Sequence, residues 1–214
     1  MARNLPIQQP PPAMKLVVQY GKCGRMRFSS HRDFARVFER ALRRAEIPMA
    51  YSSGFNPHPR ISYINPAPTG VESVAEFLVI ALSQFMDPER VRTGLDAVMP
   101  EGFPIIAVED LPANPVWGAS LWEVEIPGAD PDRLRTALET FMVASEWLVA
   151  REVKAGLREF DARGAVEVAT LVAPRIVSMV IRHTEPLVRP DDVIQALGVS
   201  DEPALIRRCA QMSG

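Results

Sequence analysis

The sequence predicts an α+β fold of two tandem ferredoxin-like (βαββαβ) halves with antiparallel sheets. Two observations lead to this prediction. Over residues 14–111, period-two and helical apolar patterns alternate in the order strand, helix, strand, strand, helix, strand. The same order returns, less regularly, over residues 119–214. Residues 112–118, which contain a proline, are expected to be a linker.

Capping residues and apolar periodicity place the elements of the first half. Ser30 and Asp33 have the spacing of a capping box, and apolar residues at helical spacing follow, so a helix is expected between Ser30 and Pro48. Asp87-Pro88-Glu89 is expected to open a second helix. Strands are expected at Lys15–Tyr20, Arg60–Ile64, Ala75–Leu82 and Phe103–Val108.

The second half is expected to follow with a helix opened by Asp130-Pro131-Asp132 and a helix at Pro190–Leu197. Its strands are expected at Leu121–Ile126, Arg175–His183 and Leu205–Gln211, with 148–160 extended in part and 163–172 unassigned between helix and strand. The segments that begin at Asp87 and Asp130 resemble each other. They are the second helix of one half and the first of the next, so shared helix-start chemistry explains the likeness.

Composition and targeting signals indicate a cytoplasmic globular protein. Apolar residues make up 47% and charged residues 23% of 214 residues, and no apolar run reaches the roughly 18 residues of a membrane-spanning helix. Residues 1–13, rich in Pro and Gln, are expected to be a disordered leader, which leaves Met14 as an alternative start.

The cysteine count limits the cofactors that the chain could bind. Cys23 and Cys209 could form one disulfide, but nothing else points to an oxidising compartment. Two cysteines cannot supply the four thiolates of an iron–sulfur cluster, nor a structural zinc site unless histidines join them. We therefore expect no cofactor and no metal.

Charge is distributed unevenly along the chain. Residues 15–60 contain ten Lys or Arg against three acids, whereas 61–130 contain eleven acids against two arginines. A basic region of this kind favours a phosphate-bearing partner. The alternative is that the arginines simply coat one solvated helix face.

Polar residues gather in two segments, at the start of the first helix and in the proline-braced loop before the next strand. If the loop folds back on the amino end of that helix, His31, His58, Arg27 and Arg60 would line one cationic pocket, since a helix N-terminus favours an anion. The candidate ligand- or phosphate-binding residues are Arg27, Ser30, His31, Arg40, Arg43, Ser52, Asn56, His58 and Arg60.

Several of these residues have simpler explanations. Capping alone accounts for Ser30, Phe55 is expected to fill the core rather than stack on a base, and His183 is expected to be structural. His31 and His58 are the candidates for an acid–base pair, which would make the chain an enzyme. The sequence has no P-loop, nucleophile elbow or dinucleotide-binding motif.

Four segments of the first half resemble the radical-SAM-linked protein family. They are Met26-Arg-Phe-Ser-Ser-His-Arg-Asp33, Phe38-Glu-Arg-Ala-Leu-Arg-Arg-Ala45, Tyr51-Ser-Ser-Gly-Phe-Asn-Pro-His-Pro-Arg-Ile-Ser62 and Pro68-Thr-Gly-Val-Glu-Ser73. This is a bacterial family of unknown function, encoded beside or fused to radical S-adenosylmethionine proteins. The resemblance is strong from Met14 to about Leu111. It implies an accessory role beside a radical-SAM protein that carries the cluster itself, and it supplies no catalytic residues.

Three functions follow as hypotheses. The first is an accessory protein of a radical-SAM enzyme that binds RNA or another phosphate-bearing substrate through the basic region from Arg25 to Arg60. The second is a metal-independent endoribonuclease that uses His31 or His58. The third is a protein-interaction subunit that docks its partner through the acidic region 61–130. No membrane partner is expected.

Overall fold

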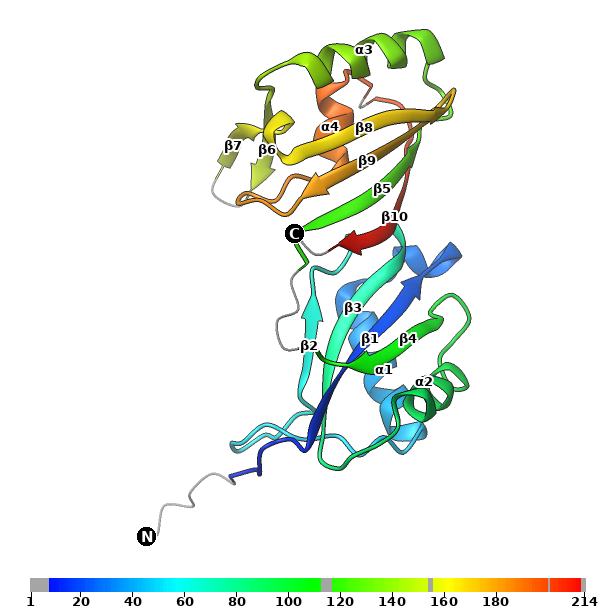
Figure 1. Cartoon of the computed structure of the whole chain (residues 1–214), viewed down its shortest axis with the longest axis vertical. Helices are drawn as coiled ribbons and strands as arrows, with labels where there is room; N and C mark the ends of the chain where they lie inside the picture. The colour runs from blue at the N-terminus through cyan, green and yellow to red at the C-terminus, as the bar shows by residue number, and fades with distance from the viewer. Residues whose placement is uncertain (1–7, 113–116, 154–155, 200, 213–214) are drawn as a thin grey trace. The chain divides into compact units, whose positions relative to one another are not determined.

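The computed structural model describes residues 8–112, 117–153, 156–199 and 201–212, which divide into unit 1 (Met1–Pro115) and unit 2 (Val116–Gly214). The described residues contain four α-helices and mostly antiparallel strands (Figure 1). The predicted α+β class is therefore confirmed.

Unit 1 is a four-stranded antiparallel sheet with two α-helices. Its strands lie in the order β4-β1-β3-β2, and each neighbouring pair is antiparallel. Its elements are β1 (Met14–Lys22), a short 3-10 helix η1 (Gly24–Phe28), α1 (His31–Arg44), β2 (Ile61–Ile64), β3 (Glu72–Leu82), α2 (Pro88–Asp96) and β4 (Ile105–Asp110).

Alternation along the strands gives this sheet one face covered by helices. Leu16, Val18 and Tyr20 of β1 join Leu78 and neighbouring β3 residues in a core with the apolar side chains of α1 and α2. Figure 1 shows both helices on that side of the sheet. Because successive strand residues point to opposite faces, the intervening residues of β1 and β3 face away from the helices.

Unit 2 is also an antiparallel sheet, in the order β10-β5-β9-β8, with a separate β6–β7 hairpin. Without the hairpin, unit 2 has the four strands β5, β8, β9 and β10. Their order in the sheet is last, first, third and second, which is also the order in unit 1. Its elements are β5 (Ala119–Glu125), α3 (Pro131–Val143), β6 (Leu148–Val153), β7 (Gly156–Asp161), the 3-10 turn η2 (Arg163–Ala165), β8 (Val166–Ala173), β9 (Ile176–Arg182), α4 (Pro190–Ala196) and β10 (Leu205–Met212).

The predicted helix starts are confirmed. The Ser30 side chain caps α1 and accepts from the Asp33 amide, and Asp87 and Asp130 cap α2 and α3 in the same way. Shared capping thus accounts for the likeness between the α2 and α3 sequences. Residues 163–172, which the sequence left unassigned, form η2 and then most of β8.

Helix α1 ends before Pro48, through its own backbone. Glu46 adopts φ +53°, the Glu46 amide donates to Arg43 O, and the Ile47 amide donates to Leu42 O. This pair of bonds is the Schellman arrangement, which satisfies carbonyls in the last turn of a helix. The chain has therefore left the helix before Pro48 is reached.

The predicted leader and linker fall partly outside the described residues, at 1–7 and 113–116. Within the described part of the leader, the Gln9 amide donates to Ser53 Oγ at 3.0 Å and the Ala13 amide donates to Leu82 O at 2.8 Å. These two bonds attach the end of the leader to unit 1.

Candidate nucleic-acid interface

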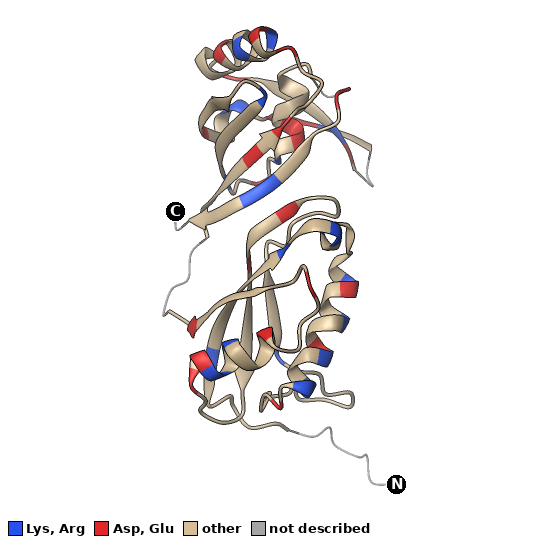
Figure 2. Ribbon diagram, turned by 90° about the vertical axis from the view of Figure 1, so that its right-hand side faces the viewer, with Lys and Arg blue, Asp and Glu red and all other residues tan. Residues whose placement is uncertain are grey.

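The exposed face of α1 carries a row of arginines. Phe34, Phe38 and Leu42 are buried against the sheet, and this orientation directs the intervening positions to solvent. The basic residues there, all exposed, are Arg32, Arg36, Arg40, Arg43 and Arg44, called here the α1 ridge. Figure 2 shows basic positions recurring along this helix. Fourteen helical residues span about 21 Å, so the ridge is a linear positive surface.

The α1 ridge arginines share their helix with two acids, Asp33 and Glu39, but form no ion pair with either among the described residues. The Arg40 Nε donates to Arg36 O at 3.3 Å within the same helix. The nearby acid Asp33 is engaged by Ser30, whose hydroxyl donates to Asp33 Oδ2 at 2.7 Å. Exposed arginines without ion pairs fit both hypotheses, a solvated helix face and a surface that binds phosphates.

Asp33 occupies the place that the sequence analysis gave to a bound anion at the start of α1. Hydrogen bonds from Ser30, followed by the charge of Arg36, lower the pKa of this carboxyl. A carboxylate at this position satisfies the amino end of the helix and interacts favourably with its dipole. Ser30 is therefore a capping residue, as the simpler explanation held.

His31 and Arg27 lie at the same end of α1. The His31 ring meets the Tyr63 ring edge-on, with centroids 4.5 Å apart. The Arg27 guanidinium lies 4.7 Å from the centroid of the exposed Phe28 ring. Burial, with a smaller contribution from Glu39, raises the pKa of Tyr63 to about 12. Tyr63 therefore stays a neutral phenol beside His31.

The loop from Tyr51 to Arg60 is closed by its own backbone. The Ser52 amide donates to His58 O at 2.9 Å, and the His58 amide donates to Ser52 Oγ at 3.1 Å. Phe55 at the tip is 74% exposed, so the prediction that it fills the core is wrong. Asn56 and His58 are exposed as well. An exposed aromatic ring beside polar groups is suited to contact with a flat partner.

This loop does not fold back on the amino end of α1, so the prediction of one pocket for Arg27, His31, His58 and Arg60 is wrong. The Arg60 amide donates to Ala50 O, and Ala50 follows the carboxyl end of α1. The base of the loop therefore lies next to the residues that follow the carboxyl end of α1, whereas His31 lies at the amino end. The physical reason is that β1 and α1 run in opposite directions, which brings the residues after α1 back to the start of β1.

The separation also bears on catalysis. His31 lies against Tyr63 near the start of α1, whereas His58 lies in the loop beyond its other end. A general acid and a general base must both reach the same reacting group, within hydrogen-bond distance or through one water. His31 and His58 cannot act together as such a pair in this arrangement.

Two charged residues near the α1 start were missed by the sequence analysis. Lys22 and Glu76 are buried, at 6% and 1% exposure. The Lys22 ammonium donates to Pro68 O at 2.9 Å, and Glu76 Oε2 accepts from the Ala67 amide at 2.8 Å. They hold the turn that precedes β3. Glu76 carried a signal, because it lies two residues before Leu78 and therefore on the same face of the predicted strand; Lys22 carried none, because it lies beyond the predicted end of the first strand.

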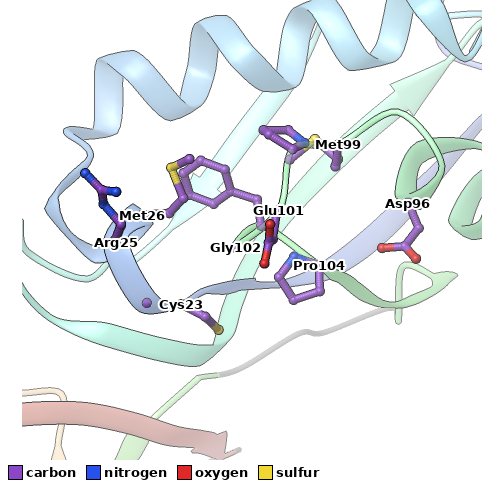
Figure 3. Close-up of a pocket in the computed structure, with 11 residues that line it drawn as sticks. Cys23, Arg25, Met26, Asp96, Met99, Glu101, Gly102 and Pro104 are labelled. Carbon is purple, nitrogen blue, oxygen red and sulfur yellow. The ribbon is translucent and has the colours of Figure 1, made fainter.

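A hollow of unit 1, of about 680 Å³, lies elsewhere (Figure 3). Arg25 and Asp96 appear at opposite ends of it in that view, and Glu101 adds a second acid. Gly102 passes so close to η1 that an added Cβ would lie 2.7 Å from Met26 Cγ. Mixed charge makes this hollow a poor anion site, and it contains none of the predicted site residues.

His183 is held in unit 2 as the sequence predicted. Its Nδ1–H donates to Trp117 O at 2.6 Å, because a carbonyl can only accept, and its Nε2 accepts from the Ser120 hydroxyl at 2.8 Å. Burial lowers the pKa of His183. The ring is a neutral structural link.

The described residues offer neither a metal-binding cluster nor a membrane-spanning helix. No group of three or more His, Cys, Asp or Glu there could hold a metal ion. No helix in that part of the chain is long and apolar enough to cross a membrane. Cys23 and Cys209 are thiols and do not form a disulfide.

These features define an α+β protein of two compact units with one strongly basic helix. Residues 15–190 match the model of a family described as uncharacterized proteins conserved in bacteria, DUF2344, and the chain belongs to this family. The match extends well past Leu111, where the motif resemblance weakens. A comparison with curated proteins finds no match. The family description names no activity and no partner.

Proposed function

We propose that the chain is an accessory protein of a radical-SAM enzyme and that it binds RNA through the α1 ridge. The observation that carries the proposal is a row of five exposed arginines that form no ion pair among the described residues. Neutralising a phosphate backbone releases condensed counterions, and that release is a large source of affinity for nucleic acid.

The geometry of the ridge favours an extended polyanion, such as an RNA strand, over a small anion. Arg32, Arg36 and Arg40 follow one another at i,i+4, so their stems rise about 6 Å per step along the helix. The guanidinium group forms paired hydrogen bonds to phosphate oxygens. Successive phosphates of one RNA strand could therefore each meet an arginine. The exposed Phe55 beyond the helix end adds a ring on which a base could stack.

The sheet topology supports a tandem ferredoxin-like interpretation. In each unit the last strand pairs with the first, the first with the third, and the third with the second, if the β6–β7 hairpin is treated as an insertion. Sheets of this kind present RNA-binding surfaces in several recognition domains. This support is an analogy of fold, and the arginines carry the functional argument.

A radical-SAM partner is supported by the resemblance of the Met26–Ser73 motifs to the radical-SAM-linked family. Two cysteines fall short of the thiolates that an iron–sulfur cluster requires, so the partner would hold the cluster. The chain described here would then present the RNA to it.

The test is salt-dependent binding of a labelled single-stranded RNA to the full chain, followed by fluorescence anisotropy. Arg40→Ala/Arg43→Ala removes two ridge charges. Each lost phosphate contact lowers the slope of log K against log salt by about 0.7, so we expect a decrease of about 1.4. The matched control, Arg90→Ala/Arg133→Ala, removes two exposed helix arginines outside the ridge and should leave the slope unchanged.

Two results would overturn the proposal. One is the absence of RNA binding at low salt. The other is an equal loss in the ridge and control variants, which would indicate attraction by overall charge. Affinity capture from the native cell with and without ribonuclease tests the partner separately. Capture of a cluster-containing protein only in the presence of RNA supports presentation of RNA, and capture without RNA favours a protein-interaction subunit.

A further inference from the structure

A second hollow of unit 1, of about 550 Å³, lies beside the Tyr51–Arg60 loop. It lies against the sheet face turned away from α1 and α2, because Val79 and Ala81 alternate with the core residues of β3. Its lining residues are Lys15, Ser52, Pro59, Arg60, Ile61, Ser62, Val79, Ala81 and Leu111.

Two cations flank a small residue in this hollow. Lys15 is paired with Ala81 across β1 and β3, and the Ala81 amide donates to Arg60 O at 3.0 Å on the other side. Adjacent strands are about 4.8 Å apart, so the Lys15 and Arg60 backbones are separated by about 10 Å. Ala81, which lies between them and lines the hollow, contributes only a methyl group. Two long basic side chains at this separation can converge on one anion.

No ion pair among the described residues includes Lys15 or Arg60. Ser52 adds a hydroxyl at the same hollow. Its oxygen already accepts from the His58 amide at 3.1 Å, and this leaves its own O–H to donate. An ammonium, a guanidinium and a hydroxyl together make a donor set suited to a phosphate.

The rest of the lining is mostly apolar. Pro59, Val79 and Leu111 contribute to it, Ser62 is a further polar residue, and Ile61 packs its side chain against the core on the other side of the sheet. Binding sites for small molecules have this composition, with a few polar groups that fix orientation and an apolar wall that takes the rest of the ligand. A ligand that suits both parts has a phosphate at one end and a flat, weakly polar body at the other.

We propose that this hollow binds a nucleoside monophosphate, with the phosphate on Lys15 and Arg60 and the base against Val79 and Leu111. This site goes beyond the α1 ridge, since the ridge would follow a phosphodiester backbone. The monophosphate could be a small molecule or the phosphorylated end of an RNA chain.

Isothermal titration of the full chain tests the site with AMP, adenosine and inorganic phosphate. We expect AMP to bind, and adenosine and phosphate each to bind at least about tenfold more weakly, since each lacks one of the two parts. Arg60→Met and Lys15→Met should each weaken AMP about tenfold. Arg40→Ala/Arg43→Ala should leave AMP affinity unchanged, so failure of the ridge and failure of the hollow are distinguishable.

The proposal would be overturned by the absence of heat with millimolar AMP, by equal affinity for AMP and adenosine, or by an equal loss in the ridge variant. Equal affinity for AMP and inorganic phosphate would show that the hollow binds an anion only, and this result would also contradict the proposal. Thermal melting verifies that the two Met variants fold. Competition of AMP by RNA with a terminal phosphate, but not by RNA with a terminal hydroxyl, would identify the chain end as the source; competition by neither would identify the small molecule.

Discussion

Arginine side chains have different surroundings in the two units. In unit 2, Arg151 Nη1 donates to Asp192 Oδ2 at 2.9 Å, Arg163 Nη1 donates to Val166 O at 2.8 Å, and Arg175 Nε donates to Ala129 O at 2.9 Å. In unit 1, the arginines of the α1 ridge extend into solvent. These three arginines hold the fold of unit 2, whereas the ridge arginines are exposed and form no ion pair among the described residues.

The largest expected effect is a loss of stability when an arginine of unit 2 is removed. Arg151→Ala leaves the Asp192 side chain, 4% exposed, without its guanidinium partner. We expect a loss of about 2–3 kcal/mol in the free energy of unfolding, below the range for a fully buried pair because Arg151 is 22% exposed. Arg36→Ala should change stability by less than about 0.5 kcal/mol. Urea denaturation measures both, and equal losses would remove the contrast.

Charge reversal on α1 should have the next largest effect, on binding rather than stability. Arg36→Glu/Arg40→Glu should weaken single-stranded RNA roughly tenfold or more, because two phosphate contacts are replaced by repulsion. Arg133→Glu/Arg135→Glu makes the same charge change on α3. If the α3 variant weakened RNA as much, the ridge would have no special role. Anisotropy at fixed salt gives the comparison.

Removal of helix caps should have a smaller effect on stability, and it tests whether RNA binds along α1 or at its amino end. Ser30→Ala and Asp130→Ala each remove a capping side chain, so each should lower the free energy of unfolding by about 1 kcal/mol. Neither should change RNA affinity if the ridge carries it. Weaker RNA binding by Ser30→Ala alone, in a folded variant, would restore the anion site at the start of α1.

The smallest expected effect is a pH dependence located in unit 2. Burial lowers the pKa of His183 below its ordinary value of 6.5, so between the two values the unfolded chain binds a proton that the folded chain does not. Stability should therefore fall as the pH drops from about 7 through 6.5. His183→Asn should flatten this part of the profile. A slope unchanged by the substitution would assign the dependence to other groups.

Much of the fold could be predicted because its signals are local. Asp87, Asp130 and Ser30 mark helix starts through bonds to amides two or three residues away, and these spacings are visible in sequence. The β6–β7 hairpin was harder, since most of its β7 residues are exposed and its pattern lacks regular alternation. Residues 163–172 could not be assigned to a helix or a strand because they contain both: the 3-10 turn η2 is followed directly by β8.

The candidate site could be predicted only residue by residue. Exposure of Arg40, Arg43, Asn56 and His58 follows from helical spacing and from the prolines of the loop. Their arrangement depends on which end of α1 the loop meets, and no local pattern fixes that. Lys15 was not among the predicted site residues, because its place near Arg60 depends on the pairing of both residues with Ala81 in the sheet.

The pairing of the last strand of unit 1 with its first has a consequence for synthesis. The β4-β1-β3-β2 ladder uses residues between Met14 and Asp110 only, so it can close once Asp110 has left the ribosome. The remaining stretch of about 100 residues takes roughly 5–20 s to translate at ordinary elongation rates. Domains of mixed α/β type fold faster than this, within about a second. The nascent chain would thus display its basic helix before unit 2 exists.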